Sequence, residues 1–233
     1  MLTGQEWSVH GGYIHSQFFG KHMKRILVIS PHPDDEVIGC GGTLAKYISK
    51  GSQIEIIFLT SGEDGIKGKN DLETMQIREQ ESREVAKFMG FKHIEFWREK
   101  DGEFKVTREL VQVLMKRIQD FNPDEIFVTH DMEQHPDHVQ AARLVMETLL
   151  KMTSGSIIPV VWMYEVWTPL QHMDRIEDIS EYVEVKRKAI QTYKSQCAIM
   201  NFEEAILGLN RYRGEMHSWP GGDYAEVFKR MII

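Results

Sequence analysis

Short runs of apolar residues alternate with longer amphipathic segments from residue 25 onwards. A continuous apolar run is typical of a strand buried on both faces, whereas apolar positions three or four residues apart predict a helix. The apolar runs predict strands at residues 25–30, 54–59, 94–97, 125–129 and 160–166. The amphipathic segments predict helices at residues 43–50, 74–89, 106–121, 139–152 and 181–196.

This alternation predicts the fold class. Strands that alternate with helices form strand–helix–strand units with right-handed crossovers and a mostly parallel sheet. We therefore expect an α/β fold, Rossmann-like and doubly wound, with helices on both faces of the sheet. No internal repeat or linker-like stretch divides the chain, so residues 23–233 are expected to form a single domain. Residues 1–22 lack the features of a secretory signal, and we interpret them as an N-terminal extension, native or foreign to the protein.

Composition narrows the class of protein. The chain has 233 residues, of which 42% are hydrophobic and 27% charged, as in globular proteins and unlike disordered chains. Its net charge of −7 argues against a nucleic acid as a partner. The longest nearly apolar stretch, residues 157–163, is far shorter than the roughly 18 residues that a membrane span requires. Because Cys40 and Cys197 form no disulfide framework, we expect free thiols and a soluble cytoplasmic protein that binds no membrane.

Two clusters of polar residues follow two of the predicted strands. The segment PHPDDE at residues 31–36 comes directly after the first strand, and the segment HDMEQHPDH at residues 130–138 directly after the fourth. In an open parallel sheet, a ligand binds outside the carboxyl ends of the strands. The predicted fold therefore brings the two clusters together.

The residue types in these clusters predict a catalytic metal ion. A catalytic zinc ion usually has three nitrogen or oxygen ligands from the protein and binds a water molecule, whose pKa it lowers to about 7. His32 and Asp35, three residues apart, can converge on one ion, and His138 can supply the third ligand. Asp34 can then accept the proton of the water, and His135, if protonated, can face the oxyanion of a tetrahedral intermediate.

Other interpretations of these segments stay open. Aspartate after proline is common in turns, where the carboxylate closes the turn or caps a helix, so either cluster alone is compatible with a structural role. The Gly-rich segment at residues 39–42 suggests phosphate binding, but the G-x-G-x-x-G pattern requires a glycine where Leu44 stands. We expect these glycines to permit close packing of a helix on the sheet.

At the two polar clusters, the sequence resembles the PIG-L/LmbE-like zinc-dependent N-acetylglucosaminide deacetylases. The segment PHPDDEVIGCGGTLAK resembles the first motif of that family, and HPDHVQAARLV resembles the second. Further segments similar to the family are SGEDG, IREQESREVAKFMG and KDGEF in the middle of the chain, and YKSQ and DYAEVF near its end. The resemblance covers about residues 24–230 and implies an LmbE-like fold.

The resemblance also implies roles for the residues in the two clusters. His32, Asp35 and His138 are implied as the zinc ligands. Asp34 is implied as the general base and then as the acid that protonates the departing amine. His135 is implied to help stabilise the oxyanion.

Two further residues match positions where members of the family hold sugar hydroxyls, namely Arg78 and Asp101. Each has a structural alternative. Arg78 can pair with Glu79 or Glu81 on an exposed helix face, and Asp101 followed by glycine is an ordinary turn.

One position departs from the family pattern. Some members have a tyrosine two residues before the first histidine of H-P-D-H, where it assists at the oxyanion, and Glu133 occupies that position here. Because a carboxylate would oppose an oxyanion, we expect Glu133 either to point away from the site or to bind a cationic part of the substrate.

We predict that the protein hydrolyses the N-acetyl group of an N-acetylglucosamine-type sugar or conjugate, with release of acetate and a free amine. Zinc is the expected cofactor, although such ligands also bind iron and other divalent ions. Two alternatives stay open, namely a metal-dependent amidase or esterase for a non-sugar acyl amine and a non-catalytic metal- or sugar-nucleotide-binding module. Trp162, Trp167 and Trp219 are candidates for a sugar-stacking surface or for core and subunit contacts. The expected partner is a small amino sugar, and the sequence leaves a homo-oligomer open.

Overall fold

The computed structural model describes residues 23–152, 158–217 and 222–233. Residues 1–22, interpreted above as an extension, lie outside the described residues, as does Trp219. The described residues contain a seven-stranded sheet with the strand order β3-β2-β1-β4-β5-β7-β6. Its strands are β1 (Arg25–Ser30), β2 (Gln53–Thr60), β3 (His93–Glu99), β4 (Glu125–Thr129), β5 (Val160–Tyr164), β6 (Arg175–Asp178) and β7 (Ala225–Arg230).

Strands β1 to β5 are parallel, and β7 pairs antiparallel with both β5 and β6. The prediction of a doubly wound, mostly parallel α/β fold is confirmed. From β1 the sheet extends through β2 and β3 on one side and through β4 and β5 on the other. The strand order therefore reverses between β1 and β4. Such a topological switch point forms a ligand-binding crevice at the carboxyl ends of the two strands.

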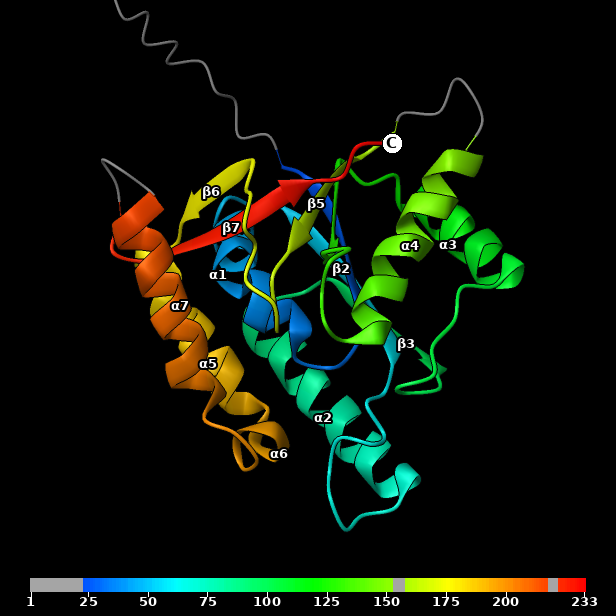
Figure 1. Cartoon of the computed structure of the whole chain (residues 1–233), viewed down its shortest axis with the longest axis horizontal. Helices are drawn as coiled ribbons and strands as arrows, with labels where there is room; N and C mark the ends of the chain where they lie inside the picture. The colour runs from blue at the N-terminus through cyan, green and yellow to red at the C-terminus, as the bar shows by residue number, and fades with distance from the viewer. Residues whose placement is uncertain (1–22, 153–157, 218–221) are drawn as a thin grey trace, which may run out of the picture.

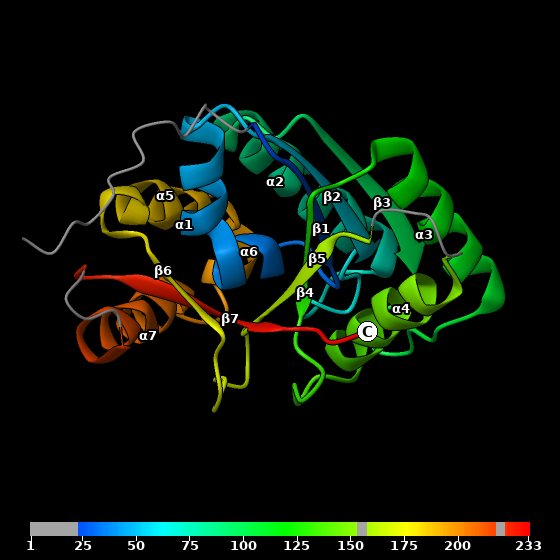
Figure 2. The ribbon, with the colours of Figure 1, turned by 90° about the horizontal axis from the view of Figure 1, so that it is seen from above.

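The sheet separates two layers of helices. Helices α1, α2 and α5 cover one face and α3 and α4 cover the other (Figures 1 and 2), while α7 packs against α5 and β7. None of the helices in the described ranges combines the length and apolar character needed to cross a bilayer. The helices are α1 (Asp35–Ser49), α2 (Asp71–Met89), α3 (Arg108–Phe121), α4 (Pro136–Lys151), the 3₁₀ turn η1 (Ser180–Tyr182), α5 (Val183–Thr192), α6 (Lys194–Cys197) and α7 (Phe202–His217).

Each face of the sheet contributes to its own hydrophobic core. In β1, Ile26 and Val28 belong to the core beneath α1, α2 and α5, whereas Leu27 and Ile29 belong to the core beneath α3 and α4. Successive side chains of a strand point to opposite faces, so a strand covered on both sides must be apolar throughout. This burial explains why β1 is a continuous apolar run, and it holds the end of that strand firmly in place.

Helix α1 begins at Asp35 and not at residue 43, where the prediction placed its start, so the Gly-rich segment 39–42 lies inside the helix. Glycine is a weak helix former, which explains why the sequence pattern did not reveal this part of the helix. A Cβ atom on Gly39 would lie 2.1 Å from a ring carbon of Tyr164 in β5. The expectation that these glycines permit close packing of a helix on the sheet is confirmed.

A kink at Cys40 interrupts α1 and frees backbone N–H groups at the start of its second half. Gly42 and Thr43 donate these N–H groups to the carboxylate of Glu226 at 2.9 and 2.7 Å. Lys186 Nζ lies 2.7 Å from the same carboxylate, and both side chains are fully buried. Because Lys186 neutralises its charge, the buried carboxylate of Glu226 can accept both N–H groups, and these hydrogen bonds link the kink of α1 to β7.

We expect Gly39→Ala to lower the free energy of unfolding by about 1–3 kcal/mol, because the added methyl group overlaps the buried ring of Tyr164. Gly208→Ala in α7 is the matched control, since no atom of the described residues lies within 4 Å of a Cβ placed there. Alanine at that helical position should preserve stability or raise it by about 0.5–1 kcal/mol. Urea unfolding followed by circular dichroism measures both effects, and equal stability of the two variants would contradict the packing described.

Candidate active site

Three buried side chains meet at the crevice between β1 and β4. His32 follows β1, Asp35 is the first residue of α1, and His138 lies in the first turn of α4. His32 Nδ1 is 3.1 Å from Asp35 Oδ2 and 3.2 Å from His138 Nε2, and His138 Nε2 is 3.2 Å from Asp35 Oδ2. We call these three atoms the ligand triangle. The structure thus brings together the three residues that the sequence predicted as metal ligands.

The ligand triangle has the dimensions of a zinc site. Ligands about 2.1 Å from a tetrahedral ion lie about 3.4 Å from one another, close to the separations observed. Attraction to His138 and His32 outweighs burial and holds the pKa of Asp35 far below its usual range, so this carboxylate stays charged. Two imidazole nitrogens and a carboxylate oxygen are common zinc ligands.

The outer nitrogen of His32 supports this assignment. His32 Nε2 lies 3.0 Å from Asp101 Oδ1 and 3.2 Å from Asp137 Oδ2, so it donates its hydrogen to these carboxylates. Burial lowers the pKa of His32, but Asp101, Asp137 and Asp35 outweigh burial and raise it well above its usual value, so Nδ1 also holds a proton that faces Asp35. A cation bound between Nδ1 and Asp35 would take the place of that proton. Burial alone would raise the pKa of Asp101, but the hydrogen bond to His32 outweighs burial and lowers this pKa to about 2.

Two other groups of residues also place candidate ligand atoms within 4.8 Å of one another, namely His32, His135 and His138, and His32, Asp101 and Asp137. Backbone N–H groups engage one atom in each of these groups. His135 Nδ1 accepts the N–H group of Asp137 at 3.3 Å, and Asp137 Oδ2 accepts the N–H group of Gly102 at 2.8 Å. We take the ligand triangle as the cation site because it combines two imidazoles with one carboxylate, a set found at catalytic zinc ions.

Asp34 lies in a strained turn beside the ligand triangle. Its φ of 128° is in the region that favours glycine, and such strain persists only where the surroundings impose it. Its N–H group donates to Glu36 Oε2 at 3.1 Å, and Arg78 donates to its carboxylate at 3.2 Å. Burial raises the pKa of Asp34 to about 7, against the opposing attraction of Arg78. A carboxylate poised near neutral pH is suited to move protons.

Arg78 is buried, and its guanidinium group also holds the backbone around the site. It donates to the carbonyl oxygens of Pro33 at 2.6 Å and Gly62 at 3.1 Å. The alternative that Arg78 pairs with a neighbouring glutamate on an exposed face is wrong, because Glu79 bonds to other arginines and Glu81 bonds to Ser195. Its predicted contact with sugar hydroxyls stays a prediction.

His135 lines the cavity beside His32. Its Nδ1 accepts the N–H group of Asp137, and its Nε2 lies on the other side of the ring. Burial, together with the neighbouring His32 and His138, lowers the pKa of His135. The neutral ring is therefore favoured, and this differs from the protonated form considered from the sequence. Because Nδ1 accepts a backbone hydrogen, the ring hydrogen is on Nε2, where a neutral His135 still offers a donor.

Glu133 points away from the cavity, which confirms the first of its two expected orientations. Its buried carboxylate accepts backbone N–H groups from Val166 at 2.7 Å and from Trp167 and Thr168 at 3.0 Å each. This carboxylate also lies 4.0 Å from His138 Nδ1. Glu133 thus fixes the segment that carries Trp167.

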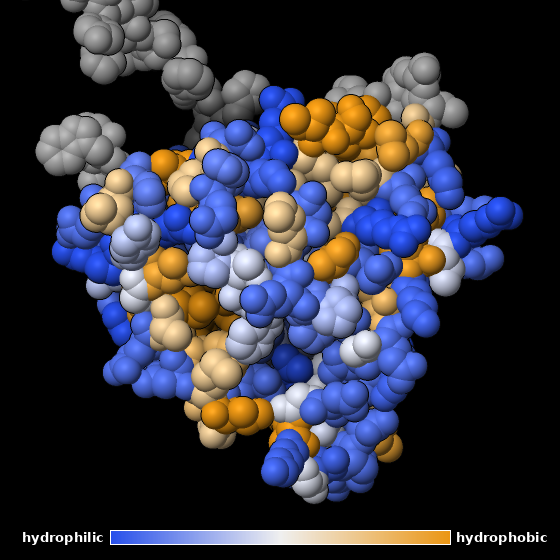
Figure 3. All heavy atoms as spheres, viewed as in Figure 1, coloured by the Kyte–Doolittle hydropathy of each residue, from blue (hydrophilic) through white to orange (hydrophobic). Residues whose placement is uncertain are grey.

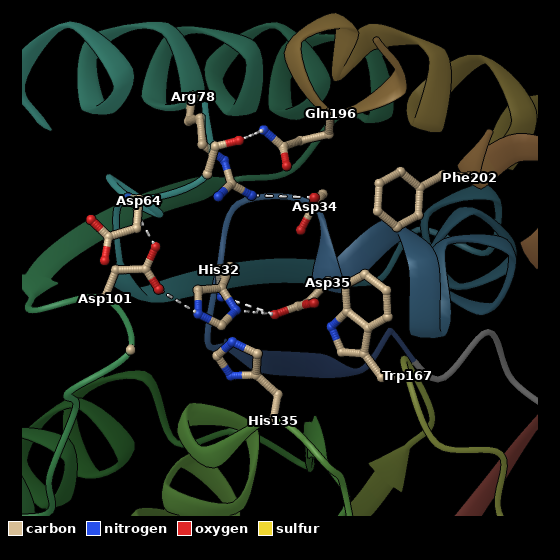
Figure 4. A pocket seen from close by; sticks show the side chains of 12 residues that line it. His32, Asp34, Asp35, Asp64, Arg78, Asp101, His135, Trp167, Gln196 and Phe202 are labelled. Atoms are coloured by element: carbon tan, nitrogen blue, oxygen red, sulfur yellow. Dashed lines mark hydrogen bonds and ion pairs between the residues drawn. The ribbon is translucent and has the colours of Figure 1, made fainter. Parts of the chain in front are cut away.

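The cavity above the ligand triangle has a volume of about 360 Å³. Hydrophilic atoms line a hollow below the centre of the face in Figure 3, and hydrophobic atoms border it on the left. Figure 4 shows the side chains that surround the cavity. They belong to His32, Asp34, Asp35, Asp64, Arg78, Asp101, His135, Trp167, Gln196 and Phe202, with Gly65 and Gly102.

Three of the lining side chains were not proposed from the sequence, namely those of Asp64, Gln196 and Phe202. Asp64 and Gln196 lie in SGEDG and YKSQ, which resembled the family, so a signal was present for both. No pattern marked Phe202. Of the tryptophans considered, Trp167 lines the cavity, whereas Trp162 lies in β5 beneath the guanidinium of Arg175.

The sequence is similar to known proteins over most of its length. The family model described as PIG-L: GlcNAc-PI de-N-acetylase matches residues 27–149, more than half of the chain. A probable N-acetyl-alpha-D-glucosaminyl L-malate deacetylase 2 of Bacillus anthracis is 29% identical over 192 residues, which cover 76% of this chain and 84% of that protein. A diacetylchitobiose deacetylase of Thermococcus kodakarensis is 29% identical over 194 residues, which cover 75% of this chain and 70% of that protein.

Solved structures share the fold. An N,N'-diacetylchitobiose deacetylase from Pyrococcus horikoshii is 28% identical with a TM-score of 0.79, covering 91% of this chain and 85% of that one. A 4-carboxy-2-hydroxymuconate hydratase from Pseudomonas putida has a TM-score of 0.80 at 22% identity, covering 91% of this chain and 97% of that one. At that identity the second likeness shows the fold alone.

We expect His138→Ala to lose the bound divalent ion, because it removes one corner of the ligand triangle. His93→Ala is the matched control, since His93 is exposed in β3. Inductively coupled plasma mass spectrometry on protein purified without chelator should find about one ion per chain in the wild type and the control. An unchanged metal content in His138→Ala would overturn the ligand assignment.

Proposed function

Because this chain belongs to the PIG-L family of GlcNAc-PI de-N-acetylases, we propose that it is a metal-dependent N-deacetylase acting on an N-acetylglucosamine-type sugar or conjugate. The observation that carries the proposal is the position of Asp34. Its buried carboxylate, held by Arg78, lies beside a ligand triangle of zinc dimensions. That pairing supplies a base and an electrophilic centre, the two components that amide hydrolysis requires.

His32, Asp35 and His138 would hold the ion, which we propose to be zinc. A divalent ion bound there supplies a Lewis acid that polarises the acetamide carbonyl and lowers the pKa of water. The residues around the triangle hold the imidazole of His32 in place. The hydrogen bonds of His32 to Asp101 and Asp137 keep its ring oriented with Nδ1 towards the ion.

Asp34 carries the proton transfers in this proposal. Its carboxylate accepts a proton from the attacking water and donates it to the nitrogen as the C–N bond breaks, which yields acetate and a free amine. Arg78 fixes the carboxylate in position through the contacts with Asp34 and Pro33. The Nε2–H group of His135 donates a hydrogen bond to the carbonyl oxygen, on which negative charge develops.

Two acidic residues on one side of the cavity suit the polyhydroxylated ring of an amino sugar. Asp64 and Asp101 both line the cavity beside His32 (Figure 4). Carboxylates accept hydrogen bonds from hydroxyl groups and attract the ammonium group of the product. We propose that Asp101 and Arg78 contact the sugar hydroxyls.

The proposed function is tested by release of primary amine from a panel of N-acetylglucosaminides, with and without a chelator. The panel contains the free sugar, the chitobiose disaccharide, and the malate and inositol conjugates. We expect release from at least one compound, abolished by the chelator and restored by zinc. No release from any compound by protein with its full metal content would contradict the proposal and favour a non-sugar acyl amine or a binding function.

We expect Asp34→Asn to reduce kcat about 10²–10⁴-fold, because the amide has nearly the same shape but cannot accept the proton of the water. The metal content should not change, since Asp34 is outside the ligand triangle. Asp120→Asn, at an exposed position in α3, is the matched control. Steady-state kinetics and metal analysis on the same preparations check both points, and near wild-type turnover in Asp34→Asn would refute the role of the base.

A further inference from the structure

The cavity has two chemically different sides. Asp64 and Asp101 lie on one side of His32, and Trp167 and Phe202 lie on the other (Figure 4). The rings of Trp167 and Phe202 meet edge to face with 5.7 Å between their centroids, which forms an aromatic wall. Asp34 lies between the two sides.

Next to Phe202 a narrow crevice adjoins the cavity, and we call it the apolar crevice. It shares Asp34, Gln196 and Phe202 with the main cavity. No space within it admits a sphere of the size of water. Its remaining lining comes from α1, α5, α6 and the residue after α5, namely Val37, Ile38, Ile190, Tyr193 and Cys197.

The apolar crevice offers little to a polar group. The hydroxyl of Tyr193 donates to Glu36 at 2.5 Å, and the amide of Gln196 donates to the carbonyl oxygen of Gly65 at 3.3 Å. Val37, Ile38 and Ile190 are almost completely buried, so the walls are held by the core of the protein. The walls therefore disfavour a polar group, and because they are fixed they leave no room for a hydrocarbon chain unless side chains are displaced.

An N-acyl sugar has a matching polarity. Its sugar carries hydroxyl groups and becomes a cationic amine after hydrolysis, so the carboxylates of Asp64 and Asp101 favour it on their side. Its acyl chain is apolar and favours the side of Trp167 and Phe202. Asp34 lines both the cavity and the crevice, so the carbonyl carbon that water attacks falls at their junction.

We propose that the apolar crevice, with Phe202 at its mouth, limits the length of the acyl group that the protein removes. The methyl group of an acetamide rests against Phe202 at the mouth, whereas a longer chain must enter a crevice too narrow for water. This inference rests on the proposed function and adds to it the acyl specificity of the same site.

The test compares kcat/KM for the N-acetyl, N-propionyl and N-butyryl forms of one glucosaminide. We expect the wild type to prefer acetyl over butyryl by at least about tenfold, since a closed pocket discriminates each methylene by about 10–200-fold. Phe202→Leu and Cys197→Ala both enlarge the crevice, and each should reduce that preference by at least about threefold. Cys197 is only partly buried, so its truncation keeps the test available if Phe202→Leu fails to fold.

Phe88→Leu, at an exposed position in α2, is the matched control and should retain the wild-type preference. Equal rates for all three chain lengths in the wild type would overturn the inference while leaving the deacylase function intact. The inference also fails if Phe202→Leu and Cys197→Ala fold but lower kcat/KM for all three substrates by the same factor. Absence of hydrolysis with every chain length would overturn the proposed function and the acyl limit together.

Discussion

The structure depends on holding two imidazoles and a carboxylate within 3.2 Å of one another away from water. A lone buried carboxylate is costly, and only a cation or close donors make such an arrangement stable. The fold meets this demand at the reversal between β1 and β4, where two loops from adjacent strands converge. His32 comes just after β1, whereas Asp35 and His138 lie in the first turns of α1 and α4, so each ligand is held by a packed element.

Around the ligand triangle, buried polar contacts serve to orient side chains. Asp101 and Asp137 fix the ring of His32, and the carboxylate of Glu133 secures the segment with Trp167. Arg78 holds the strained turn at Asp34 through a backbone carbonyl and the carboxylate itself. Strain of this kind is retained where a precise orientation is needed, and here it directs a carboxylate of raised pKa towards the reacting centre.

The sequence could predict those parts of the site that lie within short motifs. Continuous apolar runs identified β1 and β4, and the histidines and aspartates directly after them identified the ligand triangle. The start of α1 was missed because packing against Tyr164 overrides the low helix propensity of its glycines. Strand β6 was not predicted, since its four residues alternate between intermediate and exposed positions and give no apolar run.

Local sequence patterns could not predict the contacts between segments that are distant in the sequence. The grip of Arg78 on Pro33, and the crevice lined by Phe202, arise only when α2 and the C-terminal helices pack beside α1. The fold does not by itself decide the reaction either, since a hydratase shares it. In the proposed function, the ligand triangle and the base beside it determine the reaction.

The most direct test of this account is anomalous X-ray diffraction at the zinc edge, on crystals of the protein grown with zinc. The account predicts one strong peak about 2.1 Å from His32 Nδ1, Asp35 Oδ2 and His138 Nε2. A strongest peak on the opposite side of the His32 ring, between Nε2 and the carboxylates of Asp101 and Asp137, would contradict it, as would the absence of any peak at the crevice between β1 and β4.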